Sequence, residues 1–221
     1  MIAAPFFRWD WVFDHLGLIG EKVSEHLVLT GIALGVGLAI SMVLAVIGLR
    51  FPRTYPPITW LTGVLYTIPS LALFAFLVPI TGFTILSAEI GLVSYTLLIL
   101  IRNIVAGVQG VDPAVREAAL GMGYGPRRLF LEIELPLALP VILAGVRIAA
   151  VTTIGLVTIT ALIGQGGVGF FILRGLNRFF NTEIVLGTAL SVMLAVVVDL
   201  ALVVVERLLT PWMTERTAVT G

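Results

Sequence analysis

The sequence predicts an all-α membrane protein with five transmembrane helices, from its composition and from the length and spacing of its apolar stretches. Hydrophobic residues make up 59% of the 221 residues and charged residues only 12%, whereas soluble domains carry about 25% charged residues. The chain has no cysteine, which excludes disulfides, thiolate metal sites and a cysteine nucleophile. With only two histidines, both near the N-terminus, we expect no metal centre. The net charge of zero argues against general binding of nucleic acid.

Five apolar stretches have about the length of 20 residues that a helix needs to cross a bilayer. Charged residues and prolines bound them, and the first is followed by Arg50, Pro52 and Arg53. The predicted spans are 27–49, 58–79, 85–108, 137–163 and 184–205. An odd number of spans places the two termini on opposite sides of the membrane.

Arginine and lysine residues outside the spans or near their ends set the orientation, because positive residues gather on the cytoplasmic side. One side holds Arg50, Arg53, Arg102, Arg116, Arg127, Arg128, Arg207 and Arg216. The other side holds only Arg8, Lys22, Arg174 and Arg178. The N-terminus is therefore expected outside the cell and the C-terminus in the cytoplasm.

This orientation divides the chain into three parts. Residues 1–26 form an external or interfacial segment, since aromatic rings favour the bilayer interface and this segment contains Phe6, Phe7, Trp9, Trp11 and Phe13. Residues 27–207 form the transmembrane domain, with a cytoplasmic loop at 109–136. Residues 208–221 form a cytoplasmic tail.

The cytoplasmic loop is predicted to be a short helix, a sharp turn and a second short helix. Asp112 is a good N-cap and Pro113 suits the first helical position. Three glycines, at positions 121, 123 and 125, favour a turn after this helix, and Pro126 then begins the second helix. A short helix presented by a sharp turn suits docking into a groove of another protein. An ordinary connecting loop is the alternative.

Within this loop, residues 117–136 resemble the EAA loop of ABC importer permeases. The pattern falls on Glu117, Ala118, Ala119, Gly123, Ile133, Leu135 and Pro136. In that family the loop forms a coupling helix that sits in a cleft of a separate ATP-binding subunit. The resemblance implies a MetI-like permease fold and a transport subunit that is not itself an enzyme. It also implies that the chain binds no cofactor and that ATP and magnesium are used by the partner.

Four further stretches, at 66–82, 95–108, 135–149 and 162–176, resemble osmoprotectant permeases of the glycine betaine, carnitine and choline type. This resemblance implies an importer in the bacterial cytoplasmic membrane, with a second permease chain that is identical or paralogous. It also implies an extracellular solute-binding protein that captures the solute.

Two other functions stay open. Permeases for methionine or other small solutes share the EAA loop. A secondary transporter or channel would need no ATPase, but would more often show an inverted repeat or a buried carboxylate near the midplane, and neither is evident. No GxxxxGK[ST] motif occurs, so an active importer built on this chain must use the ATPase of a partner.

Residues 164–169 match the GxGxxG pattern, but a dinucleotide site requires a preceding strand. Here a membrane-length helix precedes the glycines, which favours an outer loop instead. Gly31 and Gly35 form a GxxxG pattern in the first span, which permits close helix packing within the chain or between two copies.

Polar residues in the spans are candidates for the translocation path. Aromatic faces attract quaternary ammonium groups, and hydroxyl groups can line a polar route. The candidates are Tyr66, Ser70, Tyr95, Thr152 and Thr153. Hydrogen bonding between helices is the alternative role for the serine and threonines.

Arg147 and Asp199 are charged residues inside predicted spans, where charges are costly and usually functional. Counted from the cytoplasmic ends of their spans at 1.5 Å per residue, they lie at broadly similar depths. We expect them to pair, within the chain or across a dimer. The alternative is that each side chain reaches the interface alone.

Overall fold

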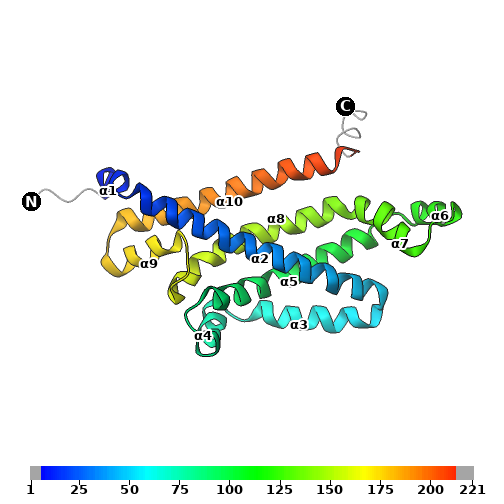
Figure 1. Ribbon diagram of the computed structural model, residues 1–221, viewed down its shortest axis with the longest axis horizontal. Coiled ribbons are helices and arrows are strands. Elements are labelled where there is room, and N and C mark those ends of the chain that lie inside the picture. The colour runs from blue at the N-terminus through cyan, green and yellow to red at the C-terminus, as the bar shows by residue number, and fades with distance from the viewer. Residues whose placement is uncertain (1–5, 213–221) are drawn as a thin grey trace, which may run out of the picture.

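The computed structural model describes residues 6–212, in which only helices, turns and connecting segments occur (Figure 1). The first half contains α1 (Trp9–Asp14), α2 (Leu16–Arg50), η1 (Pro52–Thr54), α3 (Tyr55–Thr67), α4 (Ser70–Thr81) and α5 (Ile85–Gln109). The second half contains α6 (Pro113–Gly121), α7 (Pro126–Leu129), η2 (Phe130–Glu134), α8 (Leu135–Ile159), η3 (Thr160–Ile163), α9 (Gly169–Arg178) and α10 (Asn181–Leu209).

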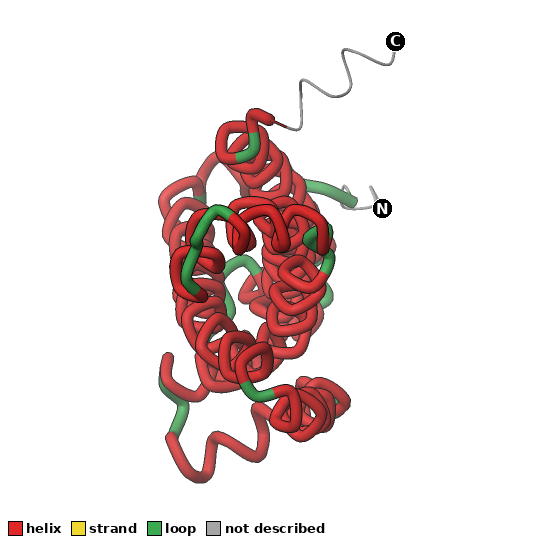
Figure 2. Tube along the Cα trace, turned by 90° about the vertical axis from the view of Figure 1, so that its right-hand side faces the viewer, coloured by secondary structure: helices red, strands yellow, loops and turns green. Residues whose placement is uncertain are grey.

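The long helices α2, α5, α8 and α10 run along the length of an elongated bundle (Figure 1). Short helices lie at its two ends, with α1 and α9 at one end and α6 and α7 at the other. Seen along its length, the bundle shows its main helices nearly end-on (Figure 2). We call the two ends the α9 end and the α6 end.

Four helical segments are long and apolar enough to cross a membrane: α2, α5, α10 and the continuous stretch Pro126–Ile163. A fifth crossing exists if the bent pair α3–α4 is counted as one span. The all-α, multi-pass prediction is therefore confirmed, with four or five spans.

The predicted second span, 58–79, is not one helix. It breaks after Thr67, and the segments before and after the break are bent by 95°. Ile68 adopts an extended conformation, with φ −64° and ψ 128°. Proline disfavours the helical conformation in the residue before it, so Pro69 explains the break.

The helix that contains the first predicted span, α2, is longer than the sequence predicts. α2 begins at Leu16 rather than at 27, so the expected boundary of the transmembrane domain lies inside a helix. Lys22 and Glu25 form an ion pair of 2.6 Å three residues apart on this helix. The charges that interrupt the apolar pattern are thus partly neutralised by each other.

The segment before α2 packs on the bundle. Trp11 of α1 contacts Phe180 edge-on, with ring centroids 5.6 Å apart, and Val12 is buried. The amide of Arg8 donates to Thr182 Oγ1 at 3.0 Å. Trp9 and Phe13 stay exposed, as aromatic residues at a bilayer interface would be.

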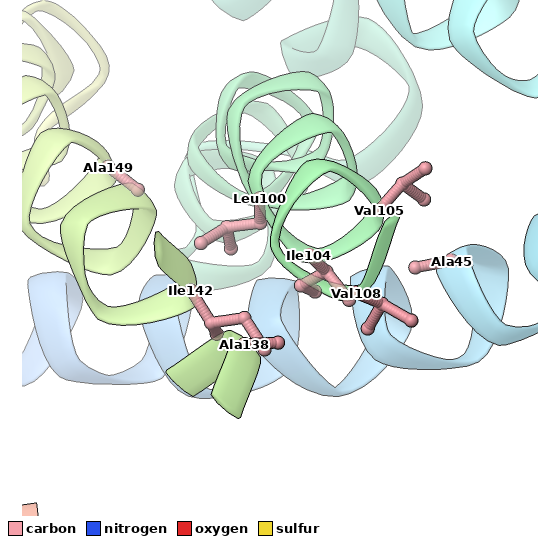
Figure 3. Close-up of a cluster of buried hydrophobic side chains, with 8 residues drawn as sticks. All are labelled: Ala45, Leu100, Ile104, Val105, Val108, Ala138, Ile142 and Ala149. Carbon is pink, nitrogen blue, oxygen red and sulfur yellow. The ribbon is translucent and has the colours of Figure 1, made fainter. Parts of the chain in front are cut away.

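The main core lies where α2, α5 and α8 meet (Figure 3). Its buried members are Ala45 from α2, then Leu100, Ile104, Val105 and Val108 from α5, and Ala138, Ile142 and Ala149 from α8. A Cβ at Gly107 would lie 2.9 Å from the carbonyl oxygen of Ala138. Small residues therefore let the backbones of these helices approach closely.

The small residues of α2 that pack inside this chain are not those of the GxxxG pattern. Gly31 and Gly35 are exposed, and a Cβ at either would meet nothing within 4 Å. The buried stripe runs instead through Ala33, Gly37 and Ala45, at a helical spacing. The GxxxG pattern therefore does not mediate helix packing within the chain. Its other predicted role, an interface between two copies of the chain, stays a prediction.

Candidate functional site at the α6 end

Helix α6 begins and ends as its local sequence predicts. The Asp112 carboxylate accepts a hydrogen bond of 2.8 Å from the Ala114 amide, and Pro113 occupies the first turn. At the other end Gly123 has φ +86°, a conformation that favours glycine. The Tyr124 amide then donates to the carbonyl of Ala119 at 3.1 Å. A cap and a glycine turn therefore define a nine-residue helix.

The second short helix is the beginning of a much longer one. α7 starts at Pro126 and continues through η2, a π-helical turn, into α8. Pro136 has no amide hydrogen to donate and its ring crowds the carbonyl four residues earlier. The wider π turn at Phe130–Glu134, directly before α8, relieves this crowding.

The EAA residues divide between an exposed face and an anchored face. Glu117, Ala118 and Gly123 are exposed, Ala119 is buried, and Ile133, Leu135 and Pro136 are half-buried. Within the described residues, Glu117 forms no ion pair. Its carboxylate is therefore free to meet a group on another protein.

Exposed apolar side chains also occur on α6, on the turn after it and on η2. Leu120 is 53% exposed, Met122 70% and Leu131 60%. Large apolar residues left exposed beside polar ones are typical of a protein-binding surface. The α6 end therefore presents a mixed apolar and acidic surface.

Arg116, which the sequence analysis treated only as a positive charge, holds the loop to the bundle. Its Nε lies 2.9 Å from Glu134 Oε1, and its NH2 group donates to the carbonyl of Val108. These partners lie 8 residues before it and 18 residues after it, at the end of α5 and the start of α8. No local pattern could have indicated these contacts.

A cavity of about 950 Å³ lies beside the loop, between the end of α2 and α7. Its lining includes Arg50, Arg127 and Arg128, with Leu49 and Phe130 as apolar walls. Arg128 also pairs with Glu132 at 2.9 Å. The α6 end therefore carries positive charge beside the acidic and apolar face of α6.

Three of the candidate path residues gather at the α3–α4 break. The rings of Tyr66 and Tyr95 meet edge-on with centroids 6.0 Å apart. The Tyr95 hydroxyl donates to the carbonyl of Ile68, which the broken helix leaves without a helical partner. Ser70 begins α4 two residues later. Tyr66 is 39% exposed, whereas Tyr95 is buried.

The two threonine candidates lie on α8. Thr152 is half-buried and its hydroxyl donates to the Ile148 carbonyl at 2.8 Å, while Thr153 is buried. Among the hydrogen bonds of residues 6–212, none joins these threonines to the tyrosines. Tyr66, Tyr95 and Ser70 therefore lie together at the break, and Leu156, one helical turn after Thr152, packs against the cluster that contains Tyr95.

Arg147 of α8 and Asp199 of α10 lie side by side. Arg147 Nε is 2.8 Å from Asp199 Oδ1 and the NH2 group is 3.0 Å from Oδ2, a two-point contact. Arg147 also reaches Glu206 Oε2 at 3.4 Å. Glu206 directly follows the last predicted span, 184–205, and was not part of the predicted pair. Its spacing of seven from Asp199 places both carboxylates on one face of α10 and is the signal that could have identified it.

At the α9 end, the glycine-rich segment after η3 is fixed to α2. Glu25 Oε1 accepts hydrogen bonds from the amides of Gly166 and Gly167, at 3.1 and 3.2 Å. Gly167 has φ +48°, and a Cβ there would lie 2.5 to 2.8 Å from the Cβ and backbone atoms of His26. The glycines therefore allow close contact with a helix, and the element directly before them is η3 rather than the strand that a dinucleotide site would require.

Charge and aromatic contacts also join the elements at the α9 end, beside a cavity of about 470 Å³. Arg174 pairs with the buried Glu183 at 2.7 Å and lies 4.5 Å from the centre of the Phe170 ring. Lys22 lies 5.2 Å from the same ring. These cations are engaged by carboxylates and aromatic faces within the chain.

Residues 31–215 match the family model described as binding-protein-dependent transport system inner membrane component. The choline transport system permease protein OpuBB of Bacillus subtilis is 37% identical over 191 residues, which cover 86% of this chain and 88% of that protein. The carnitine transport permease protein OpuCB of Listeria monocytogenes is 38% identical over 188 residues, covering 85% and 86%.

A more distant relative and a solved structure extend the comparison. The osmoprotectant import permease protein OsmW of Salmonella typhimurium is 32% identical over 206 residues, covering 91% of this chain and 96% of that protein. A structure of the MetNI methionine ABC transporter in an inward-facing conformation matches with a TM-score of 0.77 at 19% identity. That match covers 89% of this chain and 98% of the other, so the predicted MetI-like fold is confirmed. The chain belongs to the family of inner membrane components of binding-protein-dependent transport systems.

Proposed function

We propose that this chain is the membrane-spanning subunit of an ATP-driven importer for osmoprotectants. The solute class is glycine betaine, choline, carnitine or a similar quaternary ammonium compound. The observation that carries the proposal is the identity of 32 to 38% with permeases named for choline, carnitine and osmoprotectants, over most of the chain. The exposed EAA surface of α6 supports the ATP-driven mechanism.

The α6 surface docks an ATP-binding subunit. Glu117 and Ala118 meet a cleft of that subunit, and Leu120 and Met122 bury their apolar surface there. Two permease chains, identical or paralogous, form the path between them, and an extracellular binding protein delivers the solute. The α6 end faces the cytoplasm and the N-terminus faces outward, in line with the distribution of arginine and lysine residues.

ATP drives the cycle by favouring one conformation over another. A ligand shifts a conformational equilibrium only by its difference in affinity for the two states. Closure of the ATPase subunits on ATP moves α6, and the spans then open outward to accept the solute. Hydrolysis of ATP in the partner resets the spans. This chain supplies no group to that hydrolysis.

The solute passes the α3–α4 break. The exposed ring of Tyr66 offers an aromatic face to a quaternary ammonium group, with Tyr95 and Ser70 beside it. Thr152 and Thr153 line the route further along α8. Arg147 and Asp199 hold α8 against α10 as an intramembrane ion pair.

Uptake measurements test this function. The chain is expressed with its ATP-binding subunit and binding protein in cells that lack other betaine uptake, and labelled glycine betaine, choline, carnitine and methionine are supplied at high salt. We expect uptake of at least one quaternary ammonium solute, which stops when ATP is depleted. Uptake of methionine alone would assign the chain to the other importer class. Uptake that persists without the ATP-binding subunit would favour a secondary transporter or channel.

A further inference from the structure

Arg116 lies in the first turn of α6, where the helix dipole disfavours a positive charge. It is the fourth residue of α6, close to the positive end of the helix dipole. A cation there is disfavoured, because the unpaired amides of the first turn already carry partial positive charge. The location of Arg116 is therefore explained by contacts outside α6.

Both contacts join α6 to a long helix. The carbonyl of Val108 lies in the last turn of α5, where it accepts hydrogen bonds from the Val111 amide at 3.3 Å and from Arg116 Nη2. The carboxylate of Glu134, the residue directly before α8, lies 2.9 Å from Arg116 Nε. The side chains are only 30% and 15% exposed, so solvent screens the ion pair less than it would at the surface.

The covalent connections of α6 are less rigid than these contacts. Gly110 lies in the link to α5, and Gly123 and Gly125 lie in the link to α7. Glycine restricts the backbone least. Without Arg116, α6 would be held by these glycine-containing links and by the packing of Ala119.

We propose that Arg116 is a positioning residue that fixes α6 to the end of α5 and to the start of α8. A displacement of α6 by a docked ATPase then moves both spans together instead of bending the glycine links. This inference rests on the proposed function for the source of the displacement. The rigid attachment itself is a property of the isolated chain and is testable without transport.

A distance measurement in the permease tests the attachment directly. The chain has no natural cysteine, so spin labels can be placed only at Leu120→Cys on α6 and Val141→Cys on α8, both exposed sites. Labelled chains are diluted with unlabelled chains, so that only distances within one chain are measured. We expect Arg116→Gln to broaden the α6–α8 distance distribution about twofold, because local attachment is lost.

Two variants accompany this measurement. Arg116→Lys keeps the charge, but a single ammonium group cannot reach Glu134 and the Val108 carbonyl from two separate nitrogens as the guanidinium does, so intermediate broadening is expected. Arg53→Gln removes an arginine from η1 at the same end of the bundle, and Arg53 forms no ion pair within residues 6–212. Its distribution should match that of the wild type. An unchanged distribution in Arg116→Gln would overturn the proposal.

A coupling measurement then tests the consequence. The complex with its ATP-binding subunit and binding protein is reconstituted in liposomes, and glycine betaine uptake and ATP hydrolysis are both recorded. Arg116→Gln should retain the ATP-binding subunit and most ATP hydrolysis, while uptake per ATP falls about tenfold, as expected for a coupling defect. If Arg116→Gln loses the ATP-binding subunit, Arg116 acts in docking rather than in positioning. If the ratio of uptake to ATP hydrolysis is unchanged, Arg116 has no role in coupling. Absence of uptake by the wild type would contradict the proposed function, while the distance measurement would still decide the attachment.

Discussion

The two ends of the bundle are built in opposite ways. At the α6 end, a capped helix and a glycine turn present Glu117 and Leu120 to the surroundings. At the α9 end, Glu25 binds the backbone of the glycine-rich segment and Arg174 pairs with a buried carboxylate. The exposed face of α6 is therefore shaped by local signals, whereas the glycine-rich segment at the α9 end is held by contacts between distant residues.

This difference separates two effects of mutation. Changes on the exposed face of α6 remove a surface for a partner and leave the fold intact. Changes at the α9 end remove contacts on which the packing of α2 against the 164–168 segment depends. Substitutions at the α6 end are therefore expected to lower transport more than stability. Substitutions at the α9 end are expected to lower stability more than transport.

The largest effect is expected at the α6 end. Glu117→Lys reverses the exposed carboxylate, and Gly123→Pro is incompatible with φ +86°. Either change should reduce solute uptake to background, because the ATP-binding subunit no longer docks or no longer moves the spans. Uptake and co-purification of the subunit are measured together with the amount of permease in the membrane. Normal uptake in both variants would remove the coupling role of this loop.

The next effect is expected at the α9 end. Gly167→Ala introduces a Cβ at φ +48° that collides with the backbone of His26, and we expect a loss of about 2 kcal/mol or more in stability. Gly164→Ala is the matched control. It also has positive φ, +77°, but its Cβ would meet nothing within 4 Å, so only the conformational cost of about 1 kcal/mol applies. Thermal unfolding in detergent measures both, and equal losses would show that the contact with His26 contributes nothing.

The third prediction concerns the ion pair between Arg147 of α8 and Asp199 of α10. Arg147→Asp adds a third carboxylate beside those of Asp199 and Glu206, and the yield of assembled protein should fall strongly. Adding Asp199→Arg restores a pair of opposite charges and should recover most of the yield. Size-exclusion chromatography and uptake are the measurements. If the double variant recovers neither yield nor uptake, the two residues do not act through charge pairing.

The smallest effect is expected for Glu25→Gln. The amide oxygen of glutamine still accepts hydrogen bonds from Gly166 and Gly167, while the ion pair with Lys22 is lost. We expect a loss of about 1 kcal/mol, the difference between charged and neutral acceptors, with little change in uptake. A large loss of uptake without a loss of stability would contradict the division between the two ends.

Most features of the α6 loop that depend on neighbouring residues could be predicted from the sequence, but one local feature elsewhere was missed. The cap at Asp112 and the turn at Gly123 were predicted because each acts within a few residues. The bend between α3 and α4 was missed, although Pro69 is a local signal, because hydropathy is continuous across it. The GxxxG pattern was misleading as a signal of packing within the chain, because spacing alone does not say which face of a helix is buried.

By itself, the sequence determined that the chain is helical, crosses the membrane and carries a capped polar loop, since hydropathy, caps and glycine turns act over short stretches. Only the tertiary structure decided that Arg116 joins α5 to α8, that Glu25 binds the Gly166 and Gly167 amides, and that Glu206 joins the Arg147 pair. These contacts connect residues on different elements, 8 to 142 positions apart. Their partners are chosen by how the helices pack, because a charged side chain in an apolar bundle pairs with whichever opposite charge or free backbone group the packing brings within reach.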